Sequence, residues 1–450
     1  RKLSLAASGY KYLTTLFAPS KATESSSRGV QTTALPSSPT MAAMWSPIIG
    51  LLLLLLPTAP SSSIKFPLEG NVYPVGHFYA TLNIGEPAKP YFLDVDTGSN
   101  LTWLECDHPV HGCKGCHPRP PHPHYKPAAD KLRVQCGGPL CAAMRRDVPG
   151  IPECSRKDPH RCHYEIQYVT GKSEGDLATD IISVIGKDKK NIAFGCGYNQ
   201  EEPADAPPSS VDGILGLGRG KAGFAAQLKG LKMITENVIG HCFSSKGKGV
   251  LFVGDFNPPS RGVTWVPMRE SLFYYSPGLA ELFTDKQPIR GNPTFEAVFD
   301  SGTTYTFVPA QIYNELVSKV RGTLSESSLV EVKGRALPLC WKGKKPFRSV
   351  NDVKNQFKAL SLKITHAHGT SYLDIPPQNY LIVEDDGKTC LAIRDASSDP
   401  VLKELNFILI GAVTMQDLFV IYNNESKQLG WVRAQCDKAQ ELESVIDSRL

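Results

Sequence analysis

A motif that occurs twice, once in each half of the 450-residue chain, constrains the fold more than any other feature. The first copy, YFLDVDTGS, covers residues 91–99, and the second, FEAVFDSGT, covers residues 295–303. In each copy an apolar segment leads into Asp-(Thr or Ser)-Gly-(Ser or Thr), at Asp96 and at Asp300. An apolar pair followed by glycine comes later in each half and ends at Gly216 and Gly411. This repetition predicts two lobes of similar construction, each presenting one aspartate.

The rest of the sequence favours a mainly β protein. Short apolar or alternating segments recur between 38 Gly and 35 Pro residues, which is typical of strands joined by turns. Strands are expected at residues 76–84, 90–95, 180–185, 191–194, 250–253 and 407–410. Helices are expected at residues 309–320 and 350–359. Residues 106–163 are rich in Cys, His and Pro, and we expect irregular structure there.

Two aspartates, each placed at the end of an apolar strand in its own lobe, can together hydrolyse a peptide bond with one water molecule. Like charges about 3 Å apart cannot both ionise, so the pair holds one proton across an acidic window. The ionised carboxylate takes a proton from the water, and the protonated carboxyl polarises the peptide carbonyl. Gly98 and Gly302 allow tight turns that bring backbone N–H groups towards the carboxylates. We therefore expect Asp96 and Asp300 to be the catalytic residues of an aspartic endopeptidase.

The hydroxyl residues of the two motifs are expected to support this pair. Thr97 and Ser301 can tie the two loops together, and Ser99 and Thr303 can donate hydrogen bonds that orient the carboxylates. A single Asp-Thr-Gly or Asp-Ser-Gly is more often an ordinary turn. Two copies after matched apolar segments, each with a later apolar-apolar-Gly sequence, favour the catalytic interpretation.

The chain resembles the pepsin-like aspartic proteases, in particular the plant nucellin-like and nepenthesin-like branch. The resemblance covers residues 66–436 and rests on DTGSNLTW (96–103), YEIQY (164–168), FGCGY (194–198), DGILGLG (212–218), FDSGT (299–303) and LCWKGKKP (339–346). It implies a bilobal, mainly β fold with the active-site cleft between two β lobes. It also implies a flap hairpin over the cleft, in which Tyr168 matches the flap tyrosine and Trp103 matches the tryptophan that hydrogen-bonds it.

The resemblance leaves a second function open. Plant relatives that inhibit microbial xylanases keep this architecture but lose parts of the active site, so the alternative is a catalytically inactive binding or inhibitor protein. Here both aspartate loops and the flap tyrosine are intact, which favours the enzyme. One departure is that Gly411-Ala412 stands where many members have Gly-Asp. That change removes no catalytic group, but it could loosen hydrogen bonding beneath the aspartate pair.

Twelve cysteines, all after residue 100, predict a disulfide framework formed in an oxidising compartment. Sequence alone does not pair them. The resemblance implies the bonds Cys106–Cys113, Cys116–Cys196, Cys136–Cys162, Cys141–Cys154, Cys242–Cys436 and Cys340–Cys390. The Cys-x-x-Cys at 113–116, with histidines nearby, also has the spacing of zinc ligands. Because the compartment favours disulfides, we expect no metal and no cofactor.

The chain is expected to divide into five segments. Residues 1–40 are an upstream, non-mature segment, and residues 41–63 are a signal peptide with an apolar run at 48–56. Residues 64–260 form the N-terminal lobe, with a Cys-rich insertion at 106–162 and the flap. Residues 261–437 form the C-terminal lobe, and 438–450 are a tail. We expect a secreted glycoprotein of the secretory pathway, in the extracellular apoplast or the vacuole, with Asn424 as the candidate glycosylation site.

The charge distribution limits the partners. The formal net charge is +5, but residues 1–60 carry five basic groups and one acidic group, which leaves 44 basic and 43 acidic residues in the body. Such a body has no global field that would attract nucleic acid or an anionic membrane. We expect polypeptide substrates, no nucleic acid, no stable membrane span after signal removal, and a monomer.

Overall fold

The computed structural model describes residues 63–438 apart from short gaps at 118–120, 129–133, 149–150, 155–159, 169–170, 185, 202–209, 257–261, 271–272, 290, 292–293, 400 and 405. The expected upstream segment, signal peptide and tail therefore lie outside the described residues, except for Ser63 and Lys438. The described residues belong to one compact unit. No helix in the described part of the chain is long and apolar enough to cross a membrane.

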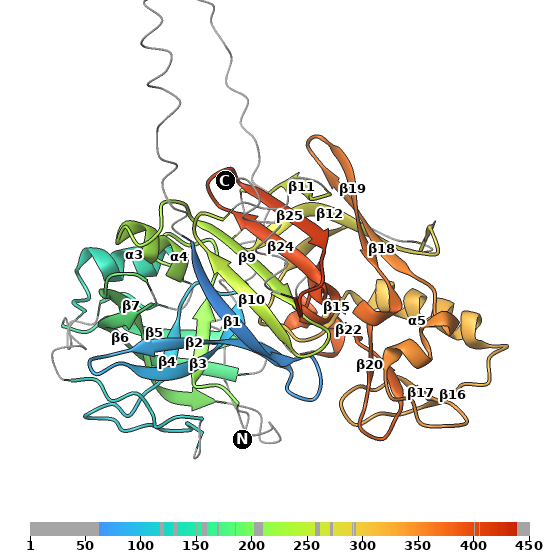
Figure 1. Cartoon of the computed structure of the whole chain (residues 1–450), viewed down its shortest axis with the longest axis horizontal. Coiled ribbons are helices and arrows are strands. Elements are labelled where there is room, and N and C mark those ends of the chain that lie inside the picture. The colour runs from blue at the N-terminus through green and yellow to red at the C-terminus, as the bar shows by residue number, and fades with distance from the viewer. Residues whose placement is uncertain are drawn as a thin grey trace, which may run out of the picture. The chain divides into compact units, whose positions relative to one another are not determined.

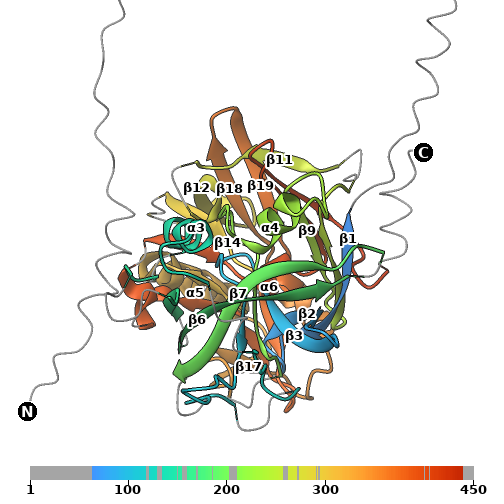
Figure 2. The same cartoon turned by 90° about the vertical axis from the view of Figure 1, so that its left-hand side faces the viewer.

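The expectation of a mainly β fold is confirmed, and the described strands form three sheets (Figure 1). The largest has the order β11 (Thr264–Pro267), β25 (Gln428–Arg433), β24 (Leu418–Asn423), β9 (Val238–Phe243), β10 (Lys248–Val253), β1 (Ile64–Asn71), β2 (His77–Ile84), β3 (Lys89–Asp96), β8 (Gly213–Gly216), β4 (Trp103–Glu105), β7 (Lys190–Glu201), β6 (Gly171–Ser183) and β5 (His163–Tyr168). Figure 2 shows the long strands β6 and β7 crossing the face formed by the first half of the chain.

The second half of the chain forms the other two sheets. One has the order β19 (Gly369–Ile375), β18 (Leu360–His366), β12 (Tyr275–Thr284), β14 (Phe295–Phe299), β23 (Phe407–Ile410), β15 (Thr306–Val308) and β22 (Ile393–Asp395), with β13 (Gln287–Pro288) beside β12. The small third sheet has the order β16 (Val330–Val332), β17 (Cys340–Lys342), β21 (Thr389–Leu391) and β20 (Leu381–Val383).

The two halves repeat one arrangement around the two motifs. Strand β3 pairs in parallel with β8, which pairs in the antiparallel sense with β4. In the second half, β14 pairs in parallel with β23, which pairs in the antiparallel sense with β15. The alternating burial of β3 and the buried β14 explain why apolar segments precede each motif. The internal repetition of the sequence is therefore a repetition of structure.

The two halves also share a sheet. Strands β1, β9 and β10 come from the first half, while β11, β24 and β25 come from the second, and they lie in one continuous order. Strand β24 pairs with β9 from Phe419 opposite Cys242 to Asn423 opposite Val238. The pairing joins the halves through backbone hydrogen bonds and an apolar cluster that includes Phe252, Phe256 and Phe419.

The helices differ in part from the expectation. Helix α5 (Ala310–Leu324) corresponds to the helix expected at 309–320 and runs one turn further. The helix expected at 350–359 is wrong, because two 3₁₀ turns stand there, η2 (Val350–Asp352) and η3 (Lys354–Gln356). The carboxylate of Asp352 accepts hydrogen bonds from the N–H groups of Arg348 and Ser349. Such local bonds compete with a regular helix.

The described residues also form three α-helices that were not expected: α3 (Pro139–Asp147), α4 (Phe224–Gly230) and α6 (Ala412–Met415). Helix α3 lies within the Cys-rich segment at 106–163, where irregular structure was expected.

Of the six disulfide pairings expected from the family resemblance, two are confirmed and four are wrong. The bonds Cys242–Cys436 and Cys340–Cys390 join the cysteines expected to pair. The expected bonds Cys106–Cys113, Cys116–Cys196, Cys136–Cys162 and Cys141–Cys154 are wrong, because the structure has Cys106–Cys196, Cys113–Cys116, Cys136–Cys154 and Cys141–Cys162.

Burial and strand register explain the four corrected pairs. Strand β4 runs parallel to β7, so Cys106 at its end lies beside Cys196, and both side chains are fully buried. Cys141 on the inner side of α3 and Cys162 before β5 are also fully buried and meet each other. In both regions the deepest cysteines pair together, and the less buried cysteines pair in the loops outside them.

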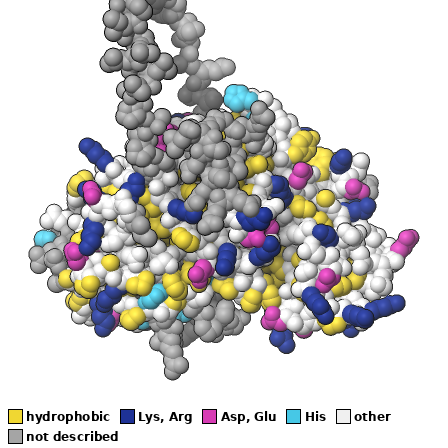
Figure 3. Space-filling view, viewed as in Figure 1, with side chains coloured by type: hydrophobic (Ala, Val, Ile, Leu, Met, Phe, Trp, Pro, Cys, Tyr) yellow, Lys and Arg dark blue, Asp and Glu magenta, His cyan; other side chains and the backbone are white. Residues whose placement is uncertain are grey.

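Charged side chains of both signs are interspersed on the surface. Figure 3 shows Lys and Arg mixed with Asp and Glu over the face seen in Figure 1. Several of these charges form ion pairs, such as Lys229 with Glu425 at 2.5 Å and Arg321 with Glu331 at 2.7 Å. Exposed pairs of this kind contribute little to stability individually.

Candidate active site

Each motif aspartate lies where a strand ends and a loop begins. Asp96 is the last residue of β3 and pairs with Gly216 of β8. Asp300 follows β14, and its N–H donates to the carbonyl oxygen of Ile410 at 3.0 Å. Parallel strands on one side and a tight loop on the other hold each backbone in place. The two halves thereby bring Asp96 and Asp300 together.

Each carboxyl group is oriented by two donors of the same kinds, a glycine N–H and a hydroxyl, from its own loop. The N–H of Gly98 donates to Oδ1 of Asp96 at 2.8 Å, and the hydroxyl of Ser99 donates to its Oδ2. In the second copy, the N–H of Gly302 donates to Oδ1 of Asp300 at 3.0 Å, and the hydroxyl of Thr303 donates to its Oδ2 at 2.8 Å. Both oxygens of each carboxyl group therefore accept a hydrogen bond from the loop that carries the aspartate.

The second residue of each motif ties the two loops together. The N–H of Thr97 donates to Oγ of Ser301 at 2.9 Å, and the N–H of Ser301 donates to Oγ1 of Thr97 at 3.0 Å. The two hydroxyls donate onward to backbone carbonyls, from Thr97 to Phe299 at 3.3 Å and from Ser301 to Val95 at 2.5 Å. Both side chains are buried. This reciprocal network fixes the spacing of the two aspartate loops.

The motif glycines are required by the opposite aspartate. A Cβ atom at Gly98 would lie 2.5 Å from Oδ1 of Asp300, and a Cβ atom at Gly302 would lie 2.6 Å from Oδ1 of Asp96. Both distances are below any normal contact. The close approach of the two loops therefore depends on the absence of a side chain at each glycine.

The two carboxyls share an environment that disfavours double ionisation. Burial, followed by the charge of Asp300, raises the pKa of Asp96 to about 7. Burial also raises the pKa of Asp300, while hydrogen bonds from Thr303 and with Asp96 oppose that rise. The two carboxyls hydrogen-bond to each other, so they titrate as one pair. The pair can hold one proton over a broad acidic range.

This raised pKa predicts a pH-dependent effect of Asp96→Asn on stability. Between pH 4 and 7 the folded chain retains a proton that the unfolded chain has released, so ionisation of the pair costs folding free energy as the pH rises. The amide cannot ionise. We expect the stability of the variant relative to wild type to increase from pH 4 to pH 7, by on the order of 2 kcal/mol.

Urea unfolding at both pH values, with the disulfides intact, measures this difference. The matched control is Asp285→Asn, because Asp285 is an exposed aspartate in the turn between β12 and β13. Its effect should be the same at both pH values. An Asp96→Asn effect that does not change with pH would contradict the raised pKa.

The expected flap pair is also brought together. Tyr168 ends β5, which forms a hairpin with β6, and the tip of the hairpin at 169–170 lies outside the described residues. The indole N–H of Trp103 donates to the hydroxyl of Tyr168 at 2.8 Å. Burial raises the pKa of Tyr168, and the charge of Asp96 raises it further, so the phenol lies near the aspartate pair.

The Trp103–Tyr168 bond predicts coupled effects of substitution. Trp103→Phe and Tyr168→Phe each remove this one bond, so we expect each to lower kcat/KM about 10-fold. The double variant should lose little more, with a coupling energy of about 1 kcal/mol. Steady-state kinetics of the four proteins in the cycle measure that coupling. Fully additive losses would mean that the bond does not hold the flap.

Asp94, to which the sequence motifs give no role, also lies beside the pair. Its Oδ1 is buried and has no hydrogen-bond partner among the described residues. Burial, then the charges of Asp96 and Asp300, raise the pKa of Asp94 well above its usual value. The available signal was an acidic residue two positions before Asp96 in an otherwise apolar strand.

The Cys-rich segment places its histidines beside carboxylates. Nδ1 of His117 lies 2.6 Å from Glu105, and Nδ1 of His122 lies 2.7 Å from Asp212. Cys113 and Cys116, the other potential zinc ligands, form a disulfide. Nδ1 of each histidine is thus within hydrogen-bond distance of a buried carboxylate.

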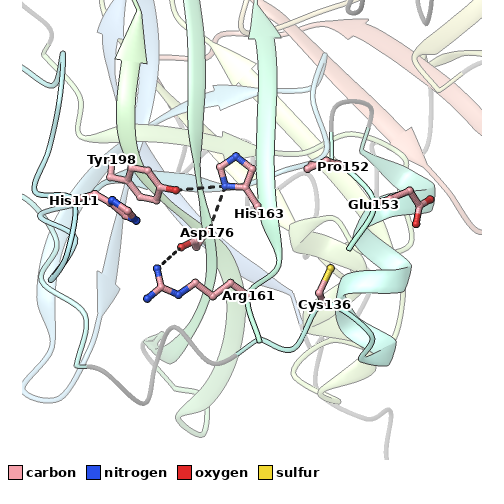
Figure 4. Close-up of a pocket in the computed structure, with 8 residues that line it drawn as sticks. All are labelled: His111, Cys136, Pro152, Glu153, Arg161, His163, Asp176 and Tyr198. Atoms are coloured by element: carbon pink, nitrogen blue, oxygen red, sulfur yellow. Dashed lines mark hydrogen bonds and ion pairs between the residues drawn. The ribbon is translucent and has the colours of Figure 1, made fainter. Parts of the chain in front are cut away.

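A separate pocket of about 300 Å³ lies in the same region (Figure 4). The buried carboxylate of Asp176 stands in its wall, 3.4 Å from Arg161 and 3.3 Å from His163. The hydrogen bond with Asp176 raises the pKa of His163. Asp176, Arg161 and His163 of this pocket are thus paired with one another.

The two remaining positions singled out in the sequence, Asn424 and Ala412, each form hydrogen bonds with neighbouring residues. The side-chain amide of Asn424 donates to Asn237 and to the hydroxyl of Tyr275, both at 3.2 Å. A glycan on that nitrogen would require these bonds to break, so glycosylation of Asn424 stays a prediction. Ala412 is fully buried at the start of α6, and its N–H donates to the carbonyl of Thr303 at 2.8 Å.

The fold and the paired aspartates together define a two-lobed β protein of the aspartic protease class. Family models described as the N-terminal and C-terminal parts of xylanase inhibitors match residues 78–255 and 281–433. An aspartic proteinase of Oryza sativa subsp. indica is 47% identical over 420 residues, covering 91% of this chain and 100% of that protein. Aspartic proteinase nepenthesin-1 of Nepenthes gracilis is 25% identical over 383 residues, covering 80% and 78%. The chain belongs to the plant pepsin-like aspartic protease family.

Solved structures share the fold at low sequence identity. The protein edgp has a TM-score of 0.62 and 15% identity, covering 85% of this chain and 97% of that chain. Basic 7S globulin from soybean has a TM-score of 0.60 and 15% identity, covering 83% and 95%. At this identity the likeness concerns the architecture alone.

Proposed function

We propose that this protein is an aspartic endopeptidase in which Asp96 and Asp300 activate one water molecule. The observation that carries the proposal is the geometry of the pair. Each carboxyl is oriented by its own glycine N–H and hydroxyl, and the loops lie so close that a Cβ atom at Gly98 or Gly302 would meet the opposite aspartate. The family relationship supports the same class of reaction.

The reaction needs the pair to carry one proton. The ionised carboxylate removes a proton from water, whose oxygen attacks the peptide carbonyl carbon. The other carboxyl gives its proton to the carbonyl oxygen, which forms a neutral tetrahedral diol. Collapse of the diol breaks the C–N bond. The leaving nitrogen takes up the proton gained from water, and a diol hydroxyl returns a proton to the pair.

The charge state sets the working range. Because the pKa of Asp96 is raised to about 7, the pair loses its last proton only near neutral pH. Activity should therefore be highest at acidic pH and decline as the pH approaches 7. Polypeptides that enter the cleft in an extended form are the proposed substrates. Six disulfides support a location in the secretory pathway, outside the cell or in the vacuole.

Cleavage of a denatured protein by the full chain, produced under oxidising conditions, tests the proposal. We would measure it between pH 3 and 7, with and without pepstatin, a statine-containing mimic of the tetrahedral intermediate. Acid-dependent cleavage that pepstatin abolishes is the expected result. A folded protein with all six disulfides and no cleavage at any pH would contradict it.

The second candidate is a binding protein that does not hydrolyse peptides. The observation that favours it is the description of both matching family models as parts of xylanase inhibitors. This candidate predicts binding to a xylanase in calorimetry together with no cleavage in the assay above. The intact aspartate pair makes it the weaker of the two.

A further inference from the structure

We propose that Asp94 is a specificity-determining residue whose carboxyl group recognises a basic substrate side chain, lysine or arginine, close to the scissile bond. The inference rests on the proposed function, because a peptide bound at Asp96 and Asp300 must present that side chain. It adds a substrate class to the proposed reaction.

Strand geometry places Asp94 beside the reacting atoms. Asp94 and Asp96 both belong to β3 and are two residues apart. Side chains two residues apart leave the same face of a strand, with a spacing of about 7 Å. An extended peptide has the same repeat, so a substrate residue close to the scissile bond can direct its side chain at Asp94.

Asp94 interrupts a row of apolar side chains. Across four neighbouring strands, Tyr79 of β2 pairs with Asp94, Asp94 with Ile214 of β8, and Ile214 with Trp103 of β4. Directly paired residues point to the same face of a sheet. The row ends at Trp103, which hydrogen-bonds Tyr168. Asp94 is therefore the acidic member of an otherwise apolar surface that leads to the flap tyrosine.

The carboxyl of Asp94 lacks a complete set of partners. Its Oδ1 is buried and has no hydrogen-bond partner among the described residues. The backbone of Val95 opposes the rise in the pKa of Asp94 only weakly, as the smallest of the contributions. The negative charges of Asp96 and Asp300 raise the pKa of Asp94, because they disfavour its ionised form. A buried acceptor without a donor is costly, so a ligand that supplies the donor is strongly preferred.

A basic side chain fits this combination of surfaces. The methylene stem of lysine can lie along Ile214 and Trp103 while its ammonium group reaches Asp94. The ammonium carries three donors and a charge opposite to that of the neighbouring acids. An aliphatic side chain of the same length would fill the apolar part and leave Oδ1 unpaired.

Matched peptides test the inference. Each contains lysine or norleucine, which has a similar stem without the amine, at one of the positions around a single scissile bond. At one position we expect wild-type kcat/KM to be at least about 10-fold higher for lysine. In Asp94→Leu the lysine-to-norleucine ratio should fall at least about 10-fold, with a smaller fall in Asp94→Asn. Asp285→Asn, which changes an exposed aspartate outside the site, should retain the preference.

The outcomes separate this inference from the proposed function. A wild-type ratio near 1 at every position overturns the inference, and so does a ratio that both Asp94 variants leave unchanged. If the wild-type protein cleaves no peptide, the endopeptidase proposal fails instead. Calorimetry with lysine and norleucine statine peptides then still tests recognition at Asp94. Equal binding of the two by the wild-type protein would overturn it.

Discussion

Asp300→Asn and Asp96→Asn should each abolish peptide hydrolysis, lowering kcat at least about 10³-fold. Each amide keeps the size of the aspartate. For Asp300→Asn, the amide oxygen can still accept from the N–H of Gly302, and the amide nitrogen can donate to the hydroxyl of Thr303, which donates to the carboxylate in the wild type. The amide cannot take a proton from water or give one to the substrate at acidic pH. The loss should therefore appear in kcat without unfolding of the protein.

A direct assay of denatured-protein cleavage at pH 4 measures this effect. Asp285→Asn is the matched control, since it makes the same chemical change at an exposed turn and should retain wild-type activity. Urea unfolding of each variant checks that the fold is intact. An Asp300→Asn protein with wild-type activity would exclude the two-carboxylate mechanism.

The apolar strands and the aspartate loops were predictable because local sequence determines them. Strand β3 alternates buried and less buried residues up to Asp96, and the burial pattern follows the two-residue period of the sequence. The glycine and the hydroxyl residues follow at fixed positions in both copies. The carboxyls, the glycine N–H groups and the hydroxyls that orient them were therefore predictable from the two motifs.

Features that depend on how distant strands lie together were not predictable. The partner of Cys106 is determined by the parallel pairing of β4 with β7, which sequence spacing does not reveal. The position of Asp94 beside the pair also depends on the register of β2, β3 and β8. An acidic residue in an apolar strand is a local signal. Its meaning appears only when neighbouring strands show that no described residue satisfies its Oδ1.

Gly98→Ala should have the second large effect, because the added methyl group would enter the space of Asp300. A Cβ atom at this position lies 2.5 Å from Oδ1, 2.6 Å from Cγ and 2.7 Å from Oδ2 of Asp300. To make room, that carboxyl would have to leave its hydrogen bonds with Gly302 and Thr303. Forcing extra volume into a packed site costs about 1–3 kcal/mol. We expect a loss of this size in the free energy of unfolding and a fall of at least about 100-fold in kcat/KM.

Gly322→Ala is the matched control, because the same methyl group meets no atom within 4 Å in helix α5. It should leave kcat/KM unchanged and raise the free energy of unfolding by about 0.5–1 kcal/mol, since alanine favours a helix over glycine. Gly302→Ala should reproduce the Gly98→Ala losses, because its Cβ would meet Asp96 in the same way. Full activity in either of these loop variants would mean that the two aspartate loops need not approach as closely as the structure places them. In that case the spacing of the carboxyls would have to be maintained by the Thr97–Ser301 network alone.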